Sequence, residues 1–156
     1  MAGDDAVGHL AWAAGRSSLA TGETVAGKWT IKRLGFLSPK VLIRDAATGK
    51  DVGALELHWR SSQFRLQNGH TYRLTHKGRL IPTWEFQDQN GARTVHIEAV
   101  REETKLAGGL VSVAAGATTN PDITLLLLVG WYFVVMEWAE EEAEAVTDST
   151  LVAWSG

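Results

Sequence analysis

Residues 123–136 read ITLLLLVGWYFVVM and contain no charged side chain. The three residues before them, Asn120-Pro121-Asp122, form a typical helix start, with Asn as N-cap, Pro at the first helical position and Asp in the positive first turn. Five glutamates end the apolar part, at positions 137, 140, 141, 142 and 144. We expect a helix over about residues 121–145 that is apolar on all sides, and protein or lipid must enclose such a helix.

The length of the uncharged run favours protein as the surrounding medium. At about 1.5 Å per residue the run is about 21 Å long, whereas the hydrocarbon core of a bilayer is about 30 Å thick. Apolar runs of about 10 to 14 residues are more often buried core helices than membrane spans. We therefore expect a buried helix. The alternative is a membrane-anchored protein that uses residues 123–138 as a transmembrane or interfacial segment.

The chain before this helix reads as β-structure. From Lys28 to about Val113, apolar and polar residues alternate in short runs that are separated by Gly and Asn turns. This pattern predicts an antiparallel meander of about eight or nine strands. The fold class that follows is mainly β with one central helix: an antiparallel β-barrel or strongly curled sheet that encloses a hydrophobic C-terminal α-helix. The turn signals lie at residues 47–50, 67–69, 76–78 and 89–91.

Side-chain parity predicts the hairpin registers, because a strand must keep its apolar residues on one face. A three-residue loop at 67–69 places Phe64 opposite Tyr72, and its glycine should adopt a left-handed conformation. The turn at 90–91 pairs Phe86 with Val95, Trp84 with Ile97 and Glu85 with His96.

The same parity places three arginines together. A turn at 76–78 pairs Leu74 with Leu80 and keeps the apolar residues of both strands on the core face. Three cations then share the opposite face, where an anion would relieve their mutual repulsion. These candidate anion-binding residues are Arg65, Arg73 and Arg79.

The chain ends are harder to assign. Residues 1–27 form an N-terminal segment in which the Ala-rich stretch 6–19 is a candidate for a short helix. The main domain covers residues 28–146, and residues 147–156 form a closing strand or a tail. The N-terminus carries acids rather than the basic residues of a secretory signal, so we expect no export signal.

Charge is distributed unevenly along the chain. Residues 28–101 hold 13 Lys or Arg against 6 Asp or Glu, a net charge of +7, whereas residues 102–156 hold 1 against 9, a net charge of −8. A basic middle segment suits an anionic partner such as a phosphate group or a membrane surface. The absence of cysteine fits a reducing compartment. We expect a cytoplasmic protein, either free or peripheral at the membrane.

Catalytic and metal-binding signatures are absent from the sequence. It contains no dinucleotide fingerprint, phosphate-binding loop, nucleophile elbow or His-Glu-x-x-His motif. The five histidines are scattered, so we predict no metal site, no cofactor and no catalytic residue. An unrecognised hydrolase that uses Glu85, His96 and Glu98 on one sheet face stays open as an alternative.

The layout resembles the tubby-like superfamily, which includes the tubby C-terminal domain, the phospholipid scramblases and the LURP-one-related proteins. The resemblance implies a closed antiparallel barrel around the apolar helix, over about residues 25–145. The superfamily pattern has twelve strands, and none of its phosphoinositide-binding or calcium-binding residues matches a position in this chain. The features that carry the resemblance are the run 41–45, Thr48-Gly49, Val52-Gly53, Phe64, Tyr72, Trp84-Glu85-Phe86 and the apolar helix 125–136.

These patterns favour a non-catalytic binding or scaffold domain. Its basic face would recognise an anionic lipid headgroup or an acidic protein surface. We expect no nucleic-acid partner, because the aromatic residues alternate with the basic ones onto the core face.

Overall fold

A computed structural model describes residues 5–12, 18–24, 26–35, 37, 39–58, 61–77, 82–103, 105–117, 120–142 and 148–153. In these residues eleven strands form one antiparallel sheet, and one long helix, α1, follows the first ten strands. The strands are β1 (Asp5–Trp12), β2 (Ala20–Thr24), β3 (Gly27–Leu34), β4 (Lys40–Asp45), β5 (Asp51–Glu56), β6 (Ser61–Leu66), β7 (Thr71–Lys77), β8 (Thr83–Gln87), β9 (Arg93–Glu102), β10 (Lys105–Val113) and β11 (Asp148–Ala153). A short 3₁₀ helix, η1 (Ala115–Ala117), precedes α1 (Ile123–Glu142).

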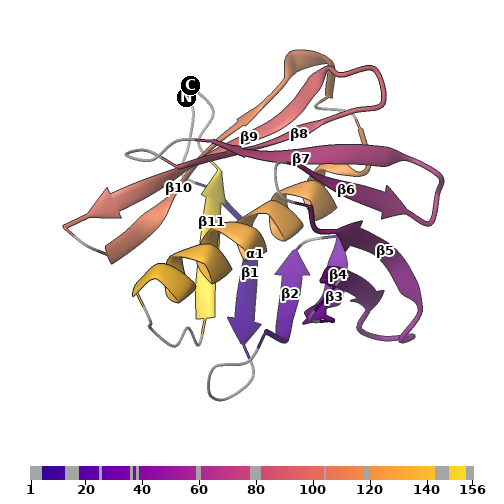
Figure 1. Ribbon diagram of the computed structural model, residues 1–156, viewed down its shortest axis with the longest axis horizontal. Helices are drawn as coiled ribbons and strands as arrows, with labels where there is room; N and C mark the ends of the chain where they lie inside the picture. The colour runs from indigo at the N-terminus through magenta and orange to yellow at the C-terminus, as the bar shows by residue number, and fades with distance from the viewer. Residues whose placement is uncertain are drawn as a thin grey trace.

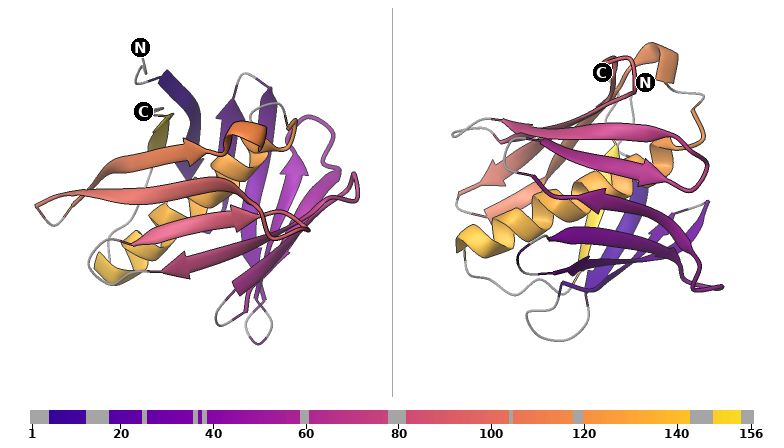
Figure 2. Two further views of the ribbon diagram at one scale, coloured as in Figure 1. Left: turned by 90° about the horizontal axis from the view of Figure 1, so that it is seen from above. Right: turned by 45° about the vertical axis from the view of Figure 1, so that its right-hand side comes forward.

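The strands from β1 to β10 follow one another in space as they do in sequence, and β11 adds beside β1. The sheet curls around α1, because the helix contacts β1, β2 and β11 from one end of the sheet and β8, β9 and β10 from the other. Figures 1 and 2 show α1 running between these two parts of the sheet. The mainly β fold with one helix inside a curled sheet is therefore confirmed.

A closed barrel is not what the structure shows. No ladder joins β10 to β11 in the described strands, although Cα atoms of these two edge strands lie within 8 Å of each other. The edge strand β10 carries a bulge between Leu106 and Gly108, and β1, the strand paired with the edge strand β11, carries one between Ala6 and Gly8. A bulge bends its strand and increases the local twist, so both ends of the sheet depart from the regular geometry that a closing ladder needs.

The helix begins as its sequence predicts. The Asn120 side chain accepts a hydrogen bond from the Asp122 backbone N–H at 2.9 Å, and the Asn120 carbonyl accepts one from Ile123 at 3.2 Å. Most of the apolar residues of α1 are buried by the sheet, among them Leu126, Leu128 and Trp131 at 1% exposure or less. Among the described residues, no helix is both long enough and apolar enough to cross a lipid bilayer.

The N-terminal segment is where the sequence reading was wrong. Of the stretch 6–19 that was assigned to a short helix, residues 6–12 belong to β1, and residues 13–17 lie outside the described residues. In β1 the buried residues Leu10 and Trp12 alternate with exposed His9 and half-buried Ala11. Two neighbouring strands, β2 and β11, pair with β1, and Leu10 and Trp12 belong to the core around α1. These tertiary interactions outweigh the helix propensity of alanine.

Two of the three predicted hairpin registers are confirmed. Phe64 lies opposite Tyr72 across the β6–β7 hairpin, and Gly69 has a φ of 92°. Phe86 lies opposite Val95, although a bulge between Phe86 and Gln87 lets the loop exceed two residues.

The third register, at 76–78, is wrong. Leu74 pairs with Phe86 rather than with Leu80. The β7–β8 connection is longer than the predicted three-residue turn. Pro82 has no N–H to donate to a ladder, and pairing resumes only at Thr83.

Glycine lets the helix and the sheet approach closely. A Cβ at Gly109 on β10 would lie 2.7 Å from Trp131 Cζ3, and a Cβ at Gly130 on α1 would lie 2.7 Å from Ile97 Cδ1. Contacts this short force neighbouring atoms to move, and a ring in a packed core moves little.

Gly109→Ala should therefore destabilise the fold. We expect the free energy of unfolding to fall by about 1–3 kcal/mol, the usual cost of overpacking. Gly116→Ala is the matched control, because nothing lies within 4 Å of a Cβ at that position. Urea titrations followed by circular dichroism compare the two variants, and equal stabilities would contradict close packing of β10 on α1.

Candidate functional site

The outer face of the sheet, which points away from α1, carries a group of exposed cations across β3 to β7. One cross-strand row runs Lys32, Leu42, Ala54, Arg65 and Thr71. The next row runs Leu34, Lys40, Glu56, Gln63, Arg73 and Gln87. Lys32, Lys40, Arg65 and Arg73 are all exposed, and we call these four residues the basic face.

Arg65 and Arg73 are brought together as parity predicts. Arg65 pairs with Thr71 and Gln63 pairs with Arg73, so the two arginines are diagonal neighbours on adjacent strands. Diagonal neighbours in a sheet lie about 7–8 Å apart. Arg65 Nη2 lies 3.5 Å from the Gln63 amide oxygen, so the hydrogen bond between the two side chains is weak. The third predicted arginine, Arg79, lies outside the described residues.

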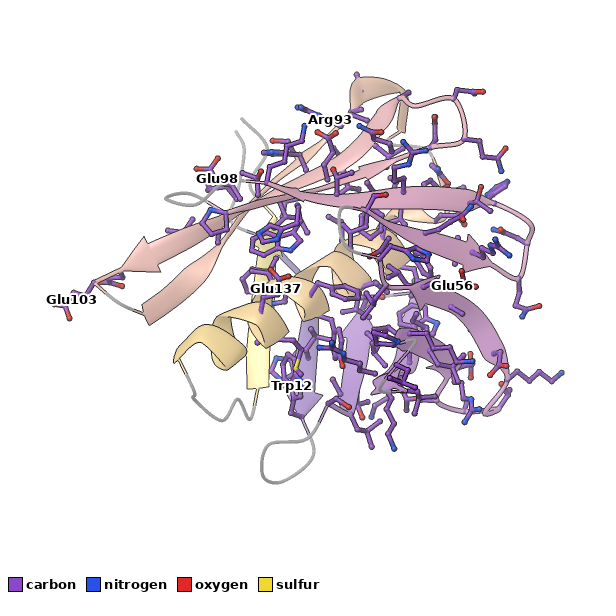
Figure 3. All side chains as sticks on the ribbon, in the orientation of Figure 1. Trp12, Glu56, Arg93, Glu98, Glu103 and Glu137 are labelled. Atoms are coloured by element: carbon purple, nitrogen blue, oxygen red, sulfur yellow. The ribbon has the colours of Figure 1, made fainter. Side chains whose placement is uncertain are left out.

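One acid faces these cations within the two rows. Glu56 is exposed on β5, and its carboxylate lies 3.9 Å from His58 Nε2; the residue is labelled in Figure 3. Next to the rows, Arg44 forms an ion pair with Asp51 at 2.9 Å. The four cations of the basic face and Glu56 carry a net charge of +3.

A polar hollow adjoins Arg73. It has a volume of about 340 Å³, and glutamine side chains from three positions contribute to its lining. Arginine and amide donors of this kind can bind phosphate oxygens, and the guanidinium can do so in a bidentate manner. The described residues that line the hollow include Gln63, Arg73, Gln87, Gln89, Ser61, Ser62, His58 and one acid, Asp88.

Glu85, His96 and Glu98 lie on the outer face of β8 and β9, but they do not form one deep pocket. Glu85 and His96 line a depression of about 190 Å³, and Glu98 is not part of its lining. Figure 3 labels Arg93 and Glu98 on this part of the sheet.

The Glu85 carboxylate is already engaged. Arg93 Nε lies 2.6 Å from one of its oxygens and Gln87 donates to the other at 2.8 Å. Burial alone would raise the pKa of Glu85, but these partners lower the pKa below its ordinary value. A carboxylate held ionised in this way is a poor general acid, so this cluster gives little support to a hydrolase.

A polar cluster at the start of α1 escaped the sequence reading. Asp122 is buried, and its carboxylate accepts hydrogen bonds from Tyr72 Oη at 2.7 Å and from Asn68 Nδ2 at 2.9 Å. His70 Nδ1 lies 2.5 Å from the same carboxylate, and Asn120 donates to Tyr72 Oη at 2.8 Å. The cluster ties the β6–β7 hairpin to α1.

The electrostatics of this cluster fit a structural role. Burial alone would raise the pKa of Asp122, but the hydrogen bonds from Tyr72, His70 and Asn68 lower it. Burial, together with the hydrogen bond to Asp122, raises the pKa of Tyr72 to about 12. At neutral pH, Asp122 is therefore a carboxylate and Tyr72 is a neutral phenol.

No family model, no curated protein and no solved structure matches the chain. Among the described residues there is also no group of three or more His, Cys, Asp or Glu side chains that could hold a metal ion. The functional interpretation therefore depends on the geometry of the basic face and of the interior.

Lys32 and Lys40 are the members of the basic face that sequence reasoning missed. Both lie on strands whose alternation was recognised, and the signal that could have found them is the parity used for the arginines. Ile31 and Ile43 are buried partners on β3 and β4, so Lys32 must point outward like Arg65.

Proposed function

We propose that this chain is a non-catalytic binding domain whose basic face docks on an anionic phospholipid surface. The observation that carries the proposal is the pair of cross-strand rows that presents four exposed cations against one acid. A membrane surface suits this face because the cations lie on four of five neighbouring strands, which are spaced about 4.8 Å apart, rather than converging on one deep pocket. Between Lys32 and Arg65 in the first row lie two half-buried apolar residues, Leu42 and Ala54.

The expected affinity is modest. Each Lys or Arg near an anionic leaflet contributes about 1 kcal/mol, and the attraction falls off within a Debye length. Four cations therefore support weak association that disappears at high salt. The hollow beside Arg73 can accommodate one phosphate group, with hydrogen-bond donors on several sides of it.

We also propose a tubby-like relationship. An antiparallel meander in sequential order and an apolar helix enclosed by it support this relationship. The eleven strands and the two unpaired edges differ from a closed barrel of twelve strands.

Vesicle flotation tests the function. The double variant Arg65→Gln/Arg73→Gln should reduce the partition coefficient onto vesicles of phosphatidylcholine and phosphatidylserine by about 30-fold at low salt, since two contributions of about 1 kcal/mol are lost. Arg65→Lys/Arg73→Lys is the matched control, because it keeps both charges and should bind like the wild type.

Two results would overturn this proposal. One is equal binding of the Gln and Lys double variants, which would exclude an electrostatic role for the arginines. The other is no binding of the wild type to anionic vesicles at 50 mM salt, in which case an acidic protein surface becomes the better partner.

A further inference from the structure

A cavity lies inside the fold, beside the C-terminal half of α1. Its volume is about 600 Å³, within the usual range of about 300–1,000 Å³ for small-molecule sites. Its lining comes from the end of β3, the residues after β5, the start of β6, the end of β7, the start of β8 and α1. The cavity therefore opens at the end of the sheet where the β3–β4, β5–β6 and β7–β8 connections lie.

The inner walls of the cavity are apolar and rigid. Leu74, Trp84 and Tyr132 line it and are each at most 5% exposed. The Trp84 ring stacks under His76 with centroids 4.5 Å apart. The Tyr132 hydroxyl donates to the Ser18 carbonyl, which fixes the ring. Leu57, Phe133 and Met136 complete the apolar lining.

The rim of the cavity is cationic. Arg33 and Lys77 are exposed at the ends of β3 and β7, and both contribute to the lining. The acid at the rim, Glu137, lies 3.3 Å from His76 Nδ1, and it is labelled on α1 in Figure 3. With neutral histidines, the described residues that line the cavity carry a net charge of +1.

Ser62 explains why space remains here. On the inward face of β6 it precedes Phe64 and Leu66, both of them buried and apolar, and it pairs with Leu74 across the hairpin. A serine at a core-facing position leaves open the volume that a leucine or phenylalanine would fill. A larger apolar residue at this position would stabilise the fold, because the atoms that line a void lose packing contacts. Selection for stability alone would therefore favour such a residue.

From these observations we propose that the cavity binds an amphipathic anion, a molecule with one aliphatic chain and one carboxylate or phosphate head group. The chain would lie against Trp84, Tyr132 and Leu74, which offer apolar surface and no charge. The head group would stay at the rim, where Arg33 and Lys77 attract it. This site shares none of the four cations of the basic face, although His58, Ser61 and Ser62 line both the cavity and the hollow beside Arg73.

Isothermal titration calorimetry on the full chain tests the proposal with four probes of equal chain length below their micellar concentrations. Dodecanoate and dodecyl phosphate should each bind with one site per chain, and their relative affinities identify the preferred head group. Dodecyltrimethylammonium should bind at least about 10-fold more weakly than either, because the rim repels a cation. Dodecanol should fall between the anions and the cation.

Two variants test whether the probes bind in the cavity. Ser62→Leu fills the cavity and should reduce dodecanoate affinity by more than about 10-fold while the protein stays folded by circular dichroism. Lys77→Glu changes only the exposed rim and should weaken dodecanoate by roughly 5-fold without weakening dodecanol. The second variant keeps the test valid if Ser62→Leu fails to fold.

The proposal is overturned if dodecyltrimethylammonium binds as tightly as dodecanoate, or if folded Ser62→Leu binds dodecanoate like the wild type. A stoichiometry well above one would also overturn it, because it would indicate adsorption on the surface. Loss of vesicle binding in Arg65→Gln/Arg73→Gln with dodecanoate binding unchanged would show that the two sites are separate.

Discussion

Trp131→Ala is expected to lower the free energy of unfolding by about 3–5 kcal/mol, the largest loss of any single change considered for this chain. Trp131 is 1% exposed and packs against Gly109 on β10 from its place on α1. Its removal leaves a void where the helix meets one edge of the sheet. Domains of this size are stable by about 5–15 kcal/mol, so this single change removes a large share of the stability.

Denaturant titration followed by far-ultraviolet circular dichroism measures this loss. Trp29→Ala is the matched control, because Trp29 is only half-buried and belongs to the periphery of the core. The same deletion should cost clearly less there. If both variants lose the same stability, α1 is not the centre of the core.

Asp122→Ala should lower the free energy of unfolding at pH 7 by about 2–4 kcal/mol. The carboxylate accepts hydrogen bonds from Tyr72 and Asn68 and contacts His70. Hydrogen bonds to charged groups contribute about 1.5–3 kcal/mol each, and partners left unpaired in the interior add a cost. The change also removes the link between the β6–β7 hairpin and the start of α1.

The effect of Asp122→Ala should depend on pH in a definite direction. The folded protein holds the pKa of Asp122 below its ordinary value of 3.8. Such a group stabilises the fold fully above its unfolded pKa, and the contribution is lost as pH falls through the folded pKa. The gap in stability between wild type and Asp122→Ala should therefore be full at pH 6 and shrink as the pH falls below about 3.8.

Chemical denaturation at pH 7, 5, 4 and 3 measures this gap. Asp45→Ala serves as the control, since Asp45 accepts two backbone hydrogen bonds in the β4–β5 turn and makes none to α1 in the described structure. Its loss should be smaller at pH 7. A gap for Asp122→Ala that is constant from pH 7 to pH 3 would contradict the proposed charge state.

Local patterns predicted much of this fold. The helix at Ile123–Glu142 was expected over about residues 121–145, because its cap and its uncharged run are both local signals. The β6–β7 and β8–β9 registers followed from parity around short loops. The β7–β8 register did not, because its connection is longer than the turn signal suggested.

Long-range pairing accounts for the rest. β1 becomes a strand because β2 and β11 flank it, and β11 is about 140 residues away along the chain. The Asp122 cluster joins residues 50 or more positions apart, so no spacing in the sequence reveals it. The common face of Arg65 and Arg73 was predictable from alternation, whereas the cavity beside Ser62 depends on how α1 crosses the sheet.

The most direct test of membrane docking asks which face meets the lipid. ¹⁵N-labelled protein can be mixed with nanodiscs of phosphatidylcholine and phosphatidylserine that carry a paramagnetic head group, and line broadening is read for each amide. We predict that broadening is concentrated on residues 28–34, 40–45 and 61–77, around the basic face, and that it is lost at 500 mM salt. Broadening centred on β9 and β10, or no broadening with anionic nanodiscs at low salt, would contradict it.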